Sequence, residues 1–200
     1  MILLIAMALS IGVALVRGGR FRHLQGMSLR YGWLAFVAVA IQIGVIYFVP
    51  DRSGASLNPR VWLLVASHLL LIAVVALNLR IPGLWLIGVG LGLNLAAMLA
   101  NGGYMPVTPE TLIRAGLPKL ASGELGSHIL GAKDILLSKE STRLWILSDI
   151  LTLPQALGLP YAFSIGDVVL SLGGFVLFQK TMRPSYPPQD SKADPTREKR

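Results

Sequence analysis

The 200-residue chain contains no cysteine, and only 14% of its residues are charged. The absence of cysteine excludes disulfide bonds, thiolate metal sites and cysteine nucleophiles. Acidic residues are the scarcer charged class, with ten Asp and Glu against 18 Lys and Arg, and the formal net charge is +8. Soluble domains have about 25% charged residues, so this shortage of charge points away from a soluble protein.

Apolar sequence takes the place of the missing charges. Hydrophobic residues make up 54% of the chain, and the mean hydropathy is +0.63. A helix that crosses the hydrocarbon core of a bilayer needs about 20 predominantly apolar residues. We therefore predict an all-α integral membrane bundle of about five transmembrane helices, with spans near residues 1–16, 32–49, 61–79, 84–100 and 165–182.

The two ends and one long polar insertion complete the predicted organisation. Basic residues follow the first apolar run instead of preceding it, so we interpret residues 1–16 as a retained anchor and not as a cleaved signal peptide. Residues 101–163 are broken by prolines, and we expect an outer segment of short interfacial helices there. The predicted transmembrane domain covers residues 1–182, and the proline-rich residues 183–200 are expected to form a disordered cytoplasmic tail.

The positions of Lys and Arg between the apolar runs predict the orientation. With the N-terminus outside, eleven of these residues fall on the inner side and seven on the outer side. Five of the seven lie in the long 101–163 segment, to which the positive-inside rule applies weakly. We therefore predict an outer N-terminus and a cytoplasmic C-terminus.

Two kinds of partner follow from the composition. The basic residues fall in the loops between apolar runs, so we expect contact with the bilayer surface and no nucleic acid partner. Anionic lipid headgroups are the predicted partners of Arg17, Arg20 and Arg22. Small residues recur four positions apart in the fourth apolar run, and this stripe is predicted to be the tightest helix-packing face: Gly88, Gly92 and Ala96.

Polar side chains inside the predicted spans are costly and therefore informative. Gln42, His68 and Asn94 fall at similar depths, counted from the ends of their apolar runs. They are candidates for a small ligand-binding pocket that opens outward. The alternative is that these side chains join helices by interhelical hydrogen bonds.

The stretch LANGGYMPVTPET, residues 99–111, ends the fourth apolar run. Asn101, Gly102 and Gly103 are typical of a helix C-terminus, where a residue adopts the left-handed conformation. Thr108 and Pro109 then have the order of an N-cap and a first helical residue. The alternative is a functional loop in which Asn101 and the two glycine amides bind a polar ligand.

Asp167 is the only acidic residue in a predicted span, and two interpretations are open. Ser164 and Asp167 have the spacing of a capping box, which places the carboxylate at a helix N-terminus. Alternatively, Asp149 and Asp167 form a catalytic pair that shares a proton and activates water, or they bind a divalent metal together with His128. The sequence has no His-x-x-x-His spacing, so neither a metal nor a cofactor is expected.

Three stretches carry a resemblance to a known family: NGGYMPV at 101–107, LSDILTLP at 147–154 and SIGDVVLSLG at 164–173. Together they resemble a bacterial family of small multi-spanning membrane proteins catalogued as a domain of unknown function. The resemblance extends to about Met182 and implies a location in the bacterial cytoplasmic membrane. The positions that it marks are Asn101, Gly102, Met105, Pro106, Asp149, Pro154, Ser164, Gly166 and Asp167.

A weaker resemblance is to lipoprotein signal peptidase, in which Ala-Asp begins the last helix as Gly166-Asp167 does here. The second catalytic acid of that enzyme belongs to a Gly-Asn-x-x-Asp-Arg pattern, and the stretch after Asn101 has no aspartate. We therefore predict a non-enzymatic binding, accessory or small-solute permeation component of the membrane. The alternative is a membrane-embedded hydrolase that uses Asp149 and Asp167.

Overall fold

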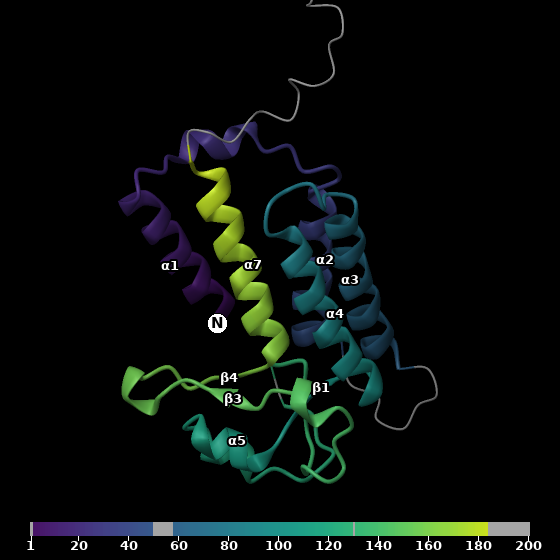
Figure 1. Ribbon diagram of the computed structural model, residues 1–200. Helices are drawn as coiled ribbons and strands as arrows, with labels where there is room; N and C mark the ends of the chain where they lie inside the picture. The colour runs from purple at the N-terminus through teal and green to yellow at the C-terminus, as the bar shows by residue number, and fades with distance from the viewer. Residues whose placement is uncertain (1, 50–57, 130, 184–200) are drawn as a thin grey trace, which may run out of the picture.

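Five long helices with a cap across one end make up the computed structural model, which describes residues 2–49, 58–129 and 131–183 (Figure 1). The chain is mostly helical, as predicted. Successive long helices run in opposite directions, so the N-terminus lies at the capped end and the last helix ends at the uncapped end. The long helices are α1 (Ile2–Val16), α2 (Trp33–Phe48), α3 (Pro59–Ala76), α4 (Leu84–Ala100) and α7 (Ile165–Thr181).

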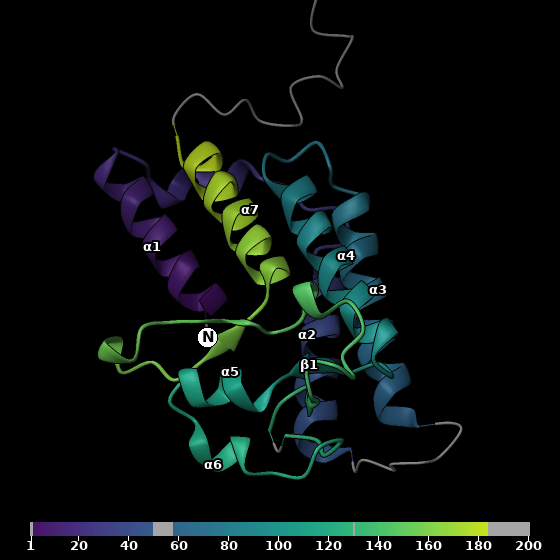
Figure 2. The ribbon, with the colours of Figure 1, turned by 60° about the horizontal axis from the view of Figure 1, so that its bottom comes forward.

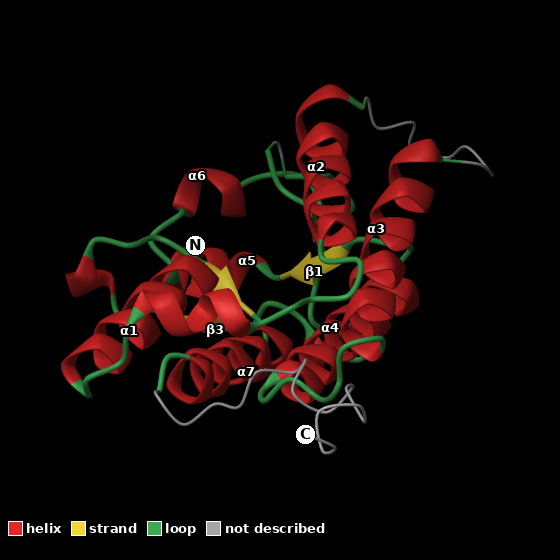
Figure 3. Ribbon diagram, turned by 90° about the horizontal axis from the view of Figure 1, so that it is seen from above, coloured by secondary structure: helices red, strands yellow, loops and turns green. Residues whose placement is uncertain are grey.

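The long helices form an arc when the molecule is seen along their axes (Figure 3). Neighbours along the arc contact one another in the order α1, α7, α4, α3 and α2. Helix α7 therefore lies between α1 and α4, although it comes last in the chain. A short 3-10 helix, η1 (Phe21–Gly26), crosses the uncapped end, where the backbone N–H of Arg20 donates to the Met182 carbonyl at 3.0 Å.

Helix α3 begins and ends at positions set by two asparagines. The Asn58 side chain accepts a hydrogen bond from the Arg60 backbone N–H at 3.1 Å, and Pro59 takes the first helical position. Asn78 donates from its amide to the carbonyls of Val74 and Arg30, at 2.7 and 2.9 Å. These bonds hold residues 77–80 in turns, so α3 ends at Ala76 instead of the predicted residue 79.

The cap, residues 101–164, crosses the base of the helices (Figure 2). It contains short helices, as predicted, but also two small sheets that were not. A parallel sheet pairs β1 with β2, and an antiparallel sheet pairs β3 with β4. Its elements are β1 (Met105–Val107), α5 (Pro109–Arg114), α6 (Pro118–Ala121), β2 (Asp134–Leu136), η2 (Trp145–Leu147), β3 (Leu151–Thr152), η3 (Gln155–Leu157) and β4 (Ala162–Phe163).

An apolar cluster joins the cap to the helices. Tyr104 and Met105 of the cap pack with Leu64 of α3 and Met98 of α4, and all four are at most 4% exposed. A second cluster inside the cap includes Val107 and other buried residues of β2 and α5. The cap is therefore docked on the ends of α3 and α4 by buried side chains, which fixes the polar groups at this junction.

Glycines bring α4 and α7 into backbone contact. A Cβ atom added at Gly90 would lie 2.6 Å from the Gly166 carbonyl oxygen, and one at Gly173 would lie 2.7 Å from the Ile87 nitrogen. Of the predicted stripe Gly88, Gly92 and Ala96, a Cβ atom added at Gly88 would lie 3.0 Å from Val75 of α3, and one at Gly92 would meet nothing within 4 Å. Helix α4 meets α7 at Gly90, which is two residues from each of these glycines and therefore on the opposite side of the helix.

The long helices differ in whether their length and hydropathy meet the requirements of a membrane span. Among the described residues, one helix, α3, is long and apolar enough to cross a membrane by these measures. Shorter apolar helices cover Leu4–Val16, Trp33–Phe48 and Leu84–Ala100. The five predicted spans thus correspond to five helices of 15 to 18 residues. The predicted tail lies outside the described residues except for its first residue, Arg183.

Candidate functional site

A buried polar network lies where α7 starts beside α4. The Ser164 hydroxyl accepts from the Asp167 backbone N–H at 3.0 Å, and Asp167 Oδ2 accepts from the Ser164 backbone N–H at 3.3 Å. The predicted capping box is therefore confirmed. Asn94 of α4 closes the network, because its Nδ2 donates to Asp167 Oδ1 at 2.8 Å and its Oδ1 accepts from the Ser164 hydroxyl at 2.7 Å.

Burial makes this network important for stability. Asn94, Ser164 and Asp167 are each at most 7% exposed. Both carboxylate oxygens of Asp167 and both ends of the Asn94 amide have partners, and a buried polar group without one costs about 1–3 kcal/mol. Asp167 therefore serves to start α7 and to hold it against α4.

Two other aspartates flank strand β1. Asp134, the first residue of β2, pairs with Met105, and Asp149 forms a bridge with Val107 on the opposite edge of β1. The Asp149 backbone N–H donates to the Pro106 carbonyl at 3.0 Å. Since paired residues of neighbouring strands point to the same face of a sheet, the Asp134 and Asp149 side chains lie on the face that carries the buried side chains of Met105 and Val107.

One oxygen of each of these two carboxyl groups lacks a hydrogen-bond partner among the described residues. The Oδ1 atoms of Asp134 and Asp149 are both shielded from solvent and have no hydrogen-bond partner among the described residues. Asp149 is 4% exposed, whereas Asp134 is half-buried as a whole residue. An ionised carboxylate in such a place is costly unless it is paired.

One lysine lies among the acids. Burial raises the pKa of Asp134 to about 6, and the positive charge of Lys133 opposes this shift. Burial also raises the pKa of Asp149 well above its ordinary value, and the nearby negative charge of Asp134 adds to the effect. Burial would lower the pKa of Lys133, but the charges of Asp149, Asp167 and Asp134 outweigh it, and that pKa is raised.

Gln42 and His68, predicted to share a pocket with Asn94, meet between α2 and α3. Gln42 Nε2 lies 3.4 Å from His68 Nδ1, which also lies 2.9 Å from the Leu64 carbonyl oxygen. The short contact to a carbonyl assigns the proton to Nδ1. Asn94 instead bonds to Ser164 and Asp167 of α7, so the three residues do not form one hydrogen-bonded group. His68 is still within electrostatic reach of Lys133 and Asp167.

Asn101, Gly102 and Gly103 terminate α4 as their pattern predicts. Gly102 and Gly103 have φ values of +73° and +91°, and the Gly103 N–H donates to the Met98 carbonyl at 2.7 Å. The Asn101 side chain donates to the Arg143 carbonyl at 2.8 Å and accepts from the Arg143 N–H at 2.9 Å. These side-chain bonds join the end of α4 to the cap, so ligand binding by this loop stays a prediction.

His128 lies in the cap against an aromatic ring. Its imidazole centroid is 4.1 Å from that of Tyr104, and the planes are inclined by 46°. Among residues 2–49, 58–129 and 131–183, no group of three or more His, Cys, Asp and Glu is placed to hold a metal ion.

The sequence did not predict Lys133 and Asp134, the two charged residues that act on Asp149 together with Asp167. It expected Asp149 to act with Asp167, and the two carboxyls do interact electrostatically, but the charge of Asp134 acts more strongly on Asp149. The available signal was the stretch Lys133-Asp134-Ile135-Leu136, in which adjacent charges precede an apolar pair. We call Lys133, Asp134 and Asp149 the junction cluster.

Comparison with known proteins identifies a family without an assigned activity. Neither the curated proteins nor the solved structures contain a match to this chain. A family model described as "Family of unknown function (DUF5317)" matches residues 26–179, which include the cap, α2, α3, α4 and all but the last two residues of α7. The predicted resemblance to a domain of unknown function agrees with this match, and the chain belongs to the DUF5317 family.

Proposed function

We propose that the chain is an integral membrane protein whose five long helices cross the bilayer. The observation that carries this proposal is the large apolar surface that the helices expose. Phe36 and Phe48 of α2 are 80% and 82% exposed, and Leu9 of α1 is 65% exposed. Contiguous apolar patches larger than a few hundred Å² are rare on soluble monomers. The few charged residues of the long helices lie in their end turns: Arg60, Asp167 and Lys180.

The helix lengths are compatible with a thin membrane. At 1.5 Å per residue, helices of 15 to 18 residues are about 23–27 Å long, against a hydrocarbon thickness of about 30 Å. Local thinning of the bilayer accommodates such a difference at modest cost. Exposed tryptophans suited to the headgroup region support the same positions. Trp62 lies in the first turn of α3, at the capped end, and Trp33 and Trp85 lie in the first turns of α2 and α4, at the uncapped end.

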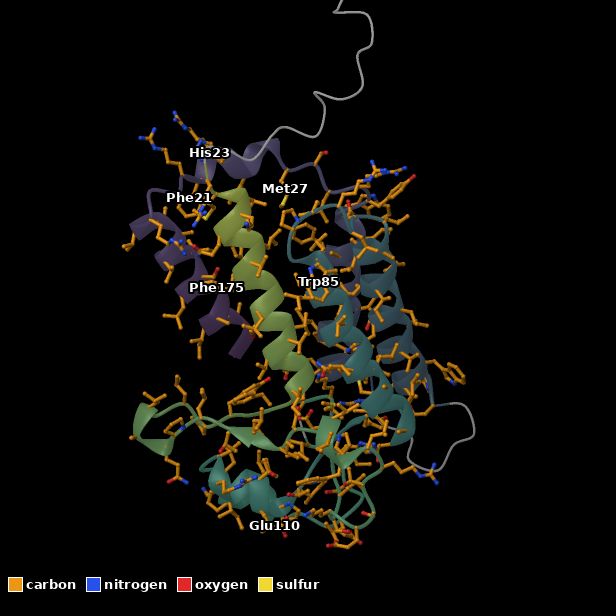
Figure 4. The ribbon with its side chains drawn as sticks, in the orientation of Figure 1. Phe21, His23, Met27, Trp85, Glu110 and Phe175 are labelled. Carbon is orange, nitrogen blue, oxygen red and sulfur yellow. The ribbon has the colours of Figure 1, made fainter. Side chains whose placement is uncertain are left out.

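Charge asymmetry supports a cytoplasmic uncapped end in the bacterial cytoplasmic membrane. All described Asp and Glu residues lie in the cap or in the first turn of α7. At the uncapped end, where Phe21 and His23 lie opposite Glu110 of the cap (Figure 4), the charged side chains within residues 2–49, 58–129 and 131–183 are all basic. These are Arg17, Arg20, Arg22, Arg30, Arg80, Lys180 and Arg183. The positive-inside rule then gives an outer N-terminus and cap and a cytoplasmic C-terminus.

Exposed arginines on the cytoplasmic side have a natural partner. Arg17, Arg20 and Arg22 are exposed beside Phe21, which is 56% exposed. Anionic headgroups of the inner leaflet attract such residues with about 1 kcal/mol each. The arginines and Phe21 would therefore anchor the uncapped end in the headgroup region.

The function that this arrangement supports is non-enzymatic binding or permeation of a small monovalent cation beneath the cap. The junction cluster has an excess of carboxyl groups over its lysine, and it lies where the cap meets the helix ends. Carboxyl oxygens without hydrogen-bond partners, on Asp134 and Asp149, are suited to a cationic solute.

Reconstitution in phospholipid vesicles tests this function. We expect the wild-type protein to carry potassium or ammonium, followed with a dye in the vesicle lumen, and Asp149→Asn to reduce the flux roughly tenfold to 100-fold. This range corresponds to the loss of a charged contact of about 1.5–3 kcal/mol. Glu124→Gln, an exposed cap variant, should keep the flux. Wild-type flux equal to that of empty vesicles would contradict the proposal.

The hydrolase alternative has one favourable observation, the raised pKa of Asp149 beside other acids. It requires Asp167 as the second catalytic carboxylate, and both oxygens of Asp167 already accept hydrogen bonds from Asn94 and Ser164. We therefore favour binding or permeation.

A further inference from the structure

We propose that the hairpin formed by β3, η3 and β4, residues 151–163, lies in the headgroup region of the outer leaflet and contacts lipid through its exposed apolar side chains. The hairpin is a part of the cap that the proposed cation site does not use, and its partner is the bilayer itself. The inference rests on the proposed insertion of the long helices in a membrane, and its test includes a separate report on that insertion.

The hairpin belongs to a stretch of the chain without charge. Residues 150–166 contain no Asp, Glu, Lys, Arg or His, whereas charged side chains recur through residues 110–149 of the same cap. Of residues 151–163, all of which the structure describes, Phe163 alone is buried. Leu157, in the 3-10 helix between the two strands, is 59% exposed. The core of this chain therefore does not account for the apolar composition of the hairpin.

The polar contacts of the hairpin are directed to α5. Gln155 Nε2 donates to the carbonyls of Ile113 and Arg114, at 3.3 and 3.2 Å. Arg114 Nη2 in turn donates to the Ile150 carbonyl at 3.0 Å. Helix α5 also carries the exposed Glu110, which lies at the end of the cap farthest from the long helices (Figure 4). These bonds hold the uncharged hairpin against the charged outer part of the cap.

The hairpin lies at the depth where headgroups are expected. Figures 1 and 2 both show β3 and β4 closer than α5 to the N-terminal end of α1. Helix α1 has 15 residues, which span about 23 Å at 1.5 Å per residue, against a hydrocarbon thickness of about 30 Å. Because α1 is shorter than the hydrocarbon core, thinning brings the hydrocarbon boundary no further than the end of the helix. The first layer beyond that end is therefore the headgroup region.

The backbone of the hairpin suits hydrated headgroups better than hydrocarbon. The backbone N–H groups of Leu157 and Gly158 donate to the carbonyls of Pro154 and Gln155, at 3.0 and 2.9 Å. Pro154 and Pro160 have no N–H group to satisfy. Strands of two residues nevertheless satisfy few backbone groups, a shortage that the headgroup region tolerates and the hydrocarbon core does not.

Quenching of single fluorescent labels by lipids tests this surface on the full chain in phosphatidylcholine vesicles. The chain has no cysteine, so Leu157→Cys carries one label. The probes are phospholipids with a nitroxide either at the headgroup or near the end of an acyl chain. We expect the label at position 157 to lose most of its fluorescence with the headgroup nitroxide and little with the acyl-chain nitroxide. Glu110→Cys, at the far end of the cap, should keep most of its fluorescence with both.

A label on the long helices separates this proposal from the proposed membrane insertion. Ile43→Cys, on the 51% exposed Ile43 of α2, should be quenched by the acyl-chain nitroxide. If position 43 is quenched but position 157 responds no more than Glu110→Cys, the hairpin proposal is overturned and the membrane insertion stands. Quenching of position 157 mainly by the acyl-chain nitroxide would also overturn it. Absence of quenching at both positions would contradict the insertion itself.

Discussion

Gly173→Ala is expected to destabilise the protein strongly, whereas Gly174→Ala, one residue along, is expected to be tolerated. A Cβ atom at Gly173 would lie 2.7 Å from the Ile87 nitrogen and 2.9 Å from the Gly83 carbonyl oxygen. Both are backbone atoms, which yield only if α4 and α7 separate. Overpacking of this kind costs about 1–3 kcal/mol, to be measured as a lower midpoint of thermal unfolding in detergent.

The neighbouring glycine supplies the control for this measurement. A Cβ atom at Gly174 meets nothing within 4 Å, and Ala is favoured over Gly in a helix by up to about 1 kcal/mol. Gly174→Ala should therefore leave the midpoint unchanged or raise it slightly. Gly90→Ala and Gly92→Ala form a second matched pair on α4, for the same reason. Equal midpoints for Gly173→Ala and Gly174→Ala would show that α4 and α7 do not pack through these glycines.

Asp167→Ala is expected to have an effect of similar size by a different mechanism. The substitution removes the capping box of α7, a loss of about 1 kcal/mol. It also leaves the buried Nδ2 of Asn94 without the acceptor that now lies 2.8 Å away, which costs about 1–3 kcal/mol more. The free energy of unfolding should fall by roughly 2–4 kcal/mol in total.

Glu110→Ala is the matched control for Asp167→Ala, because Glu110 is also an acid in the first turn of a helix, α5, but is exposed. It should change the midpoint little, since surface substitutions are usually within about 0.5 kcal/mol. If Asp167→Ala kept wild-type stability while abolishing cation flux, Asp167 would be a functional group and not a structural one.

The sequence predicted the features that depend on residues close together in the chain, namely the long helices and several of their ends. Apolar runs gave the five long helices, and Ser164 with Asp167 gave the start of α7. Asn101 and Gly102 gave the end of α4, since a left-handed residue terminates a helix wherever it occurs. The end of α3 was misplaced because Asn78 bonds to Arg30, a residue 48 positions away.

The features that the sequence did not predict depend on contacts between segments that are far apart in the chain. The junction cluster depends on β1 lying between β2 and the segment that contains Asp149, and strands of three residues carry no pattern that fixes such a register. The packing face of α4 was missed for a related reason. Gly83 and Gly90 match Gly166 and Gly173 in spacing, seven residues in each case, and only the two helices together reveal this match.

Insertion of the helices in a bilayer, with the cap outside, is the claim on which the proposed function depends. The chain has no cysteine, so single cysteines at exposed positions are specific reporters for a maleimide that cannot cross membranes. We expect Glu124→Cys in the cap to be labelled in intact cells, and Arg22→Cys at the uncapped end to be labelled only after the cells are opened. Labelling of both positions in intact cells, or of Arg22→Cys alone, would contradict this arrangement.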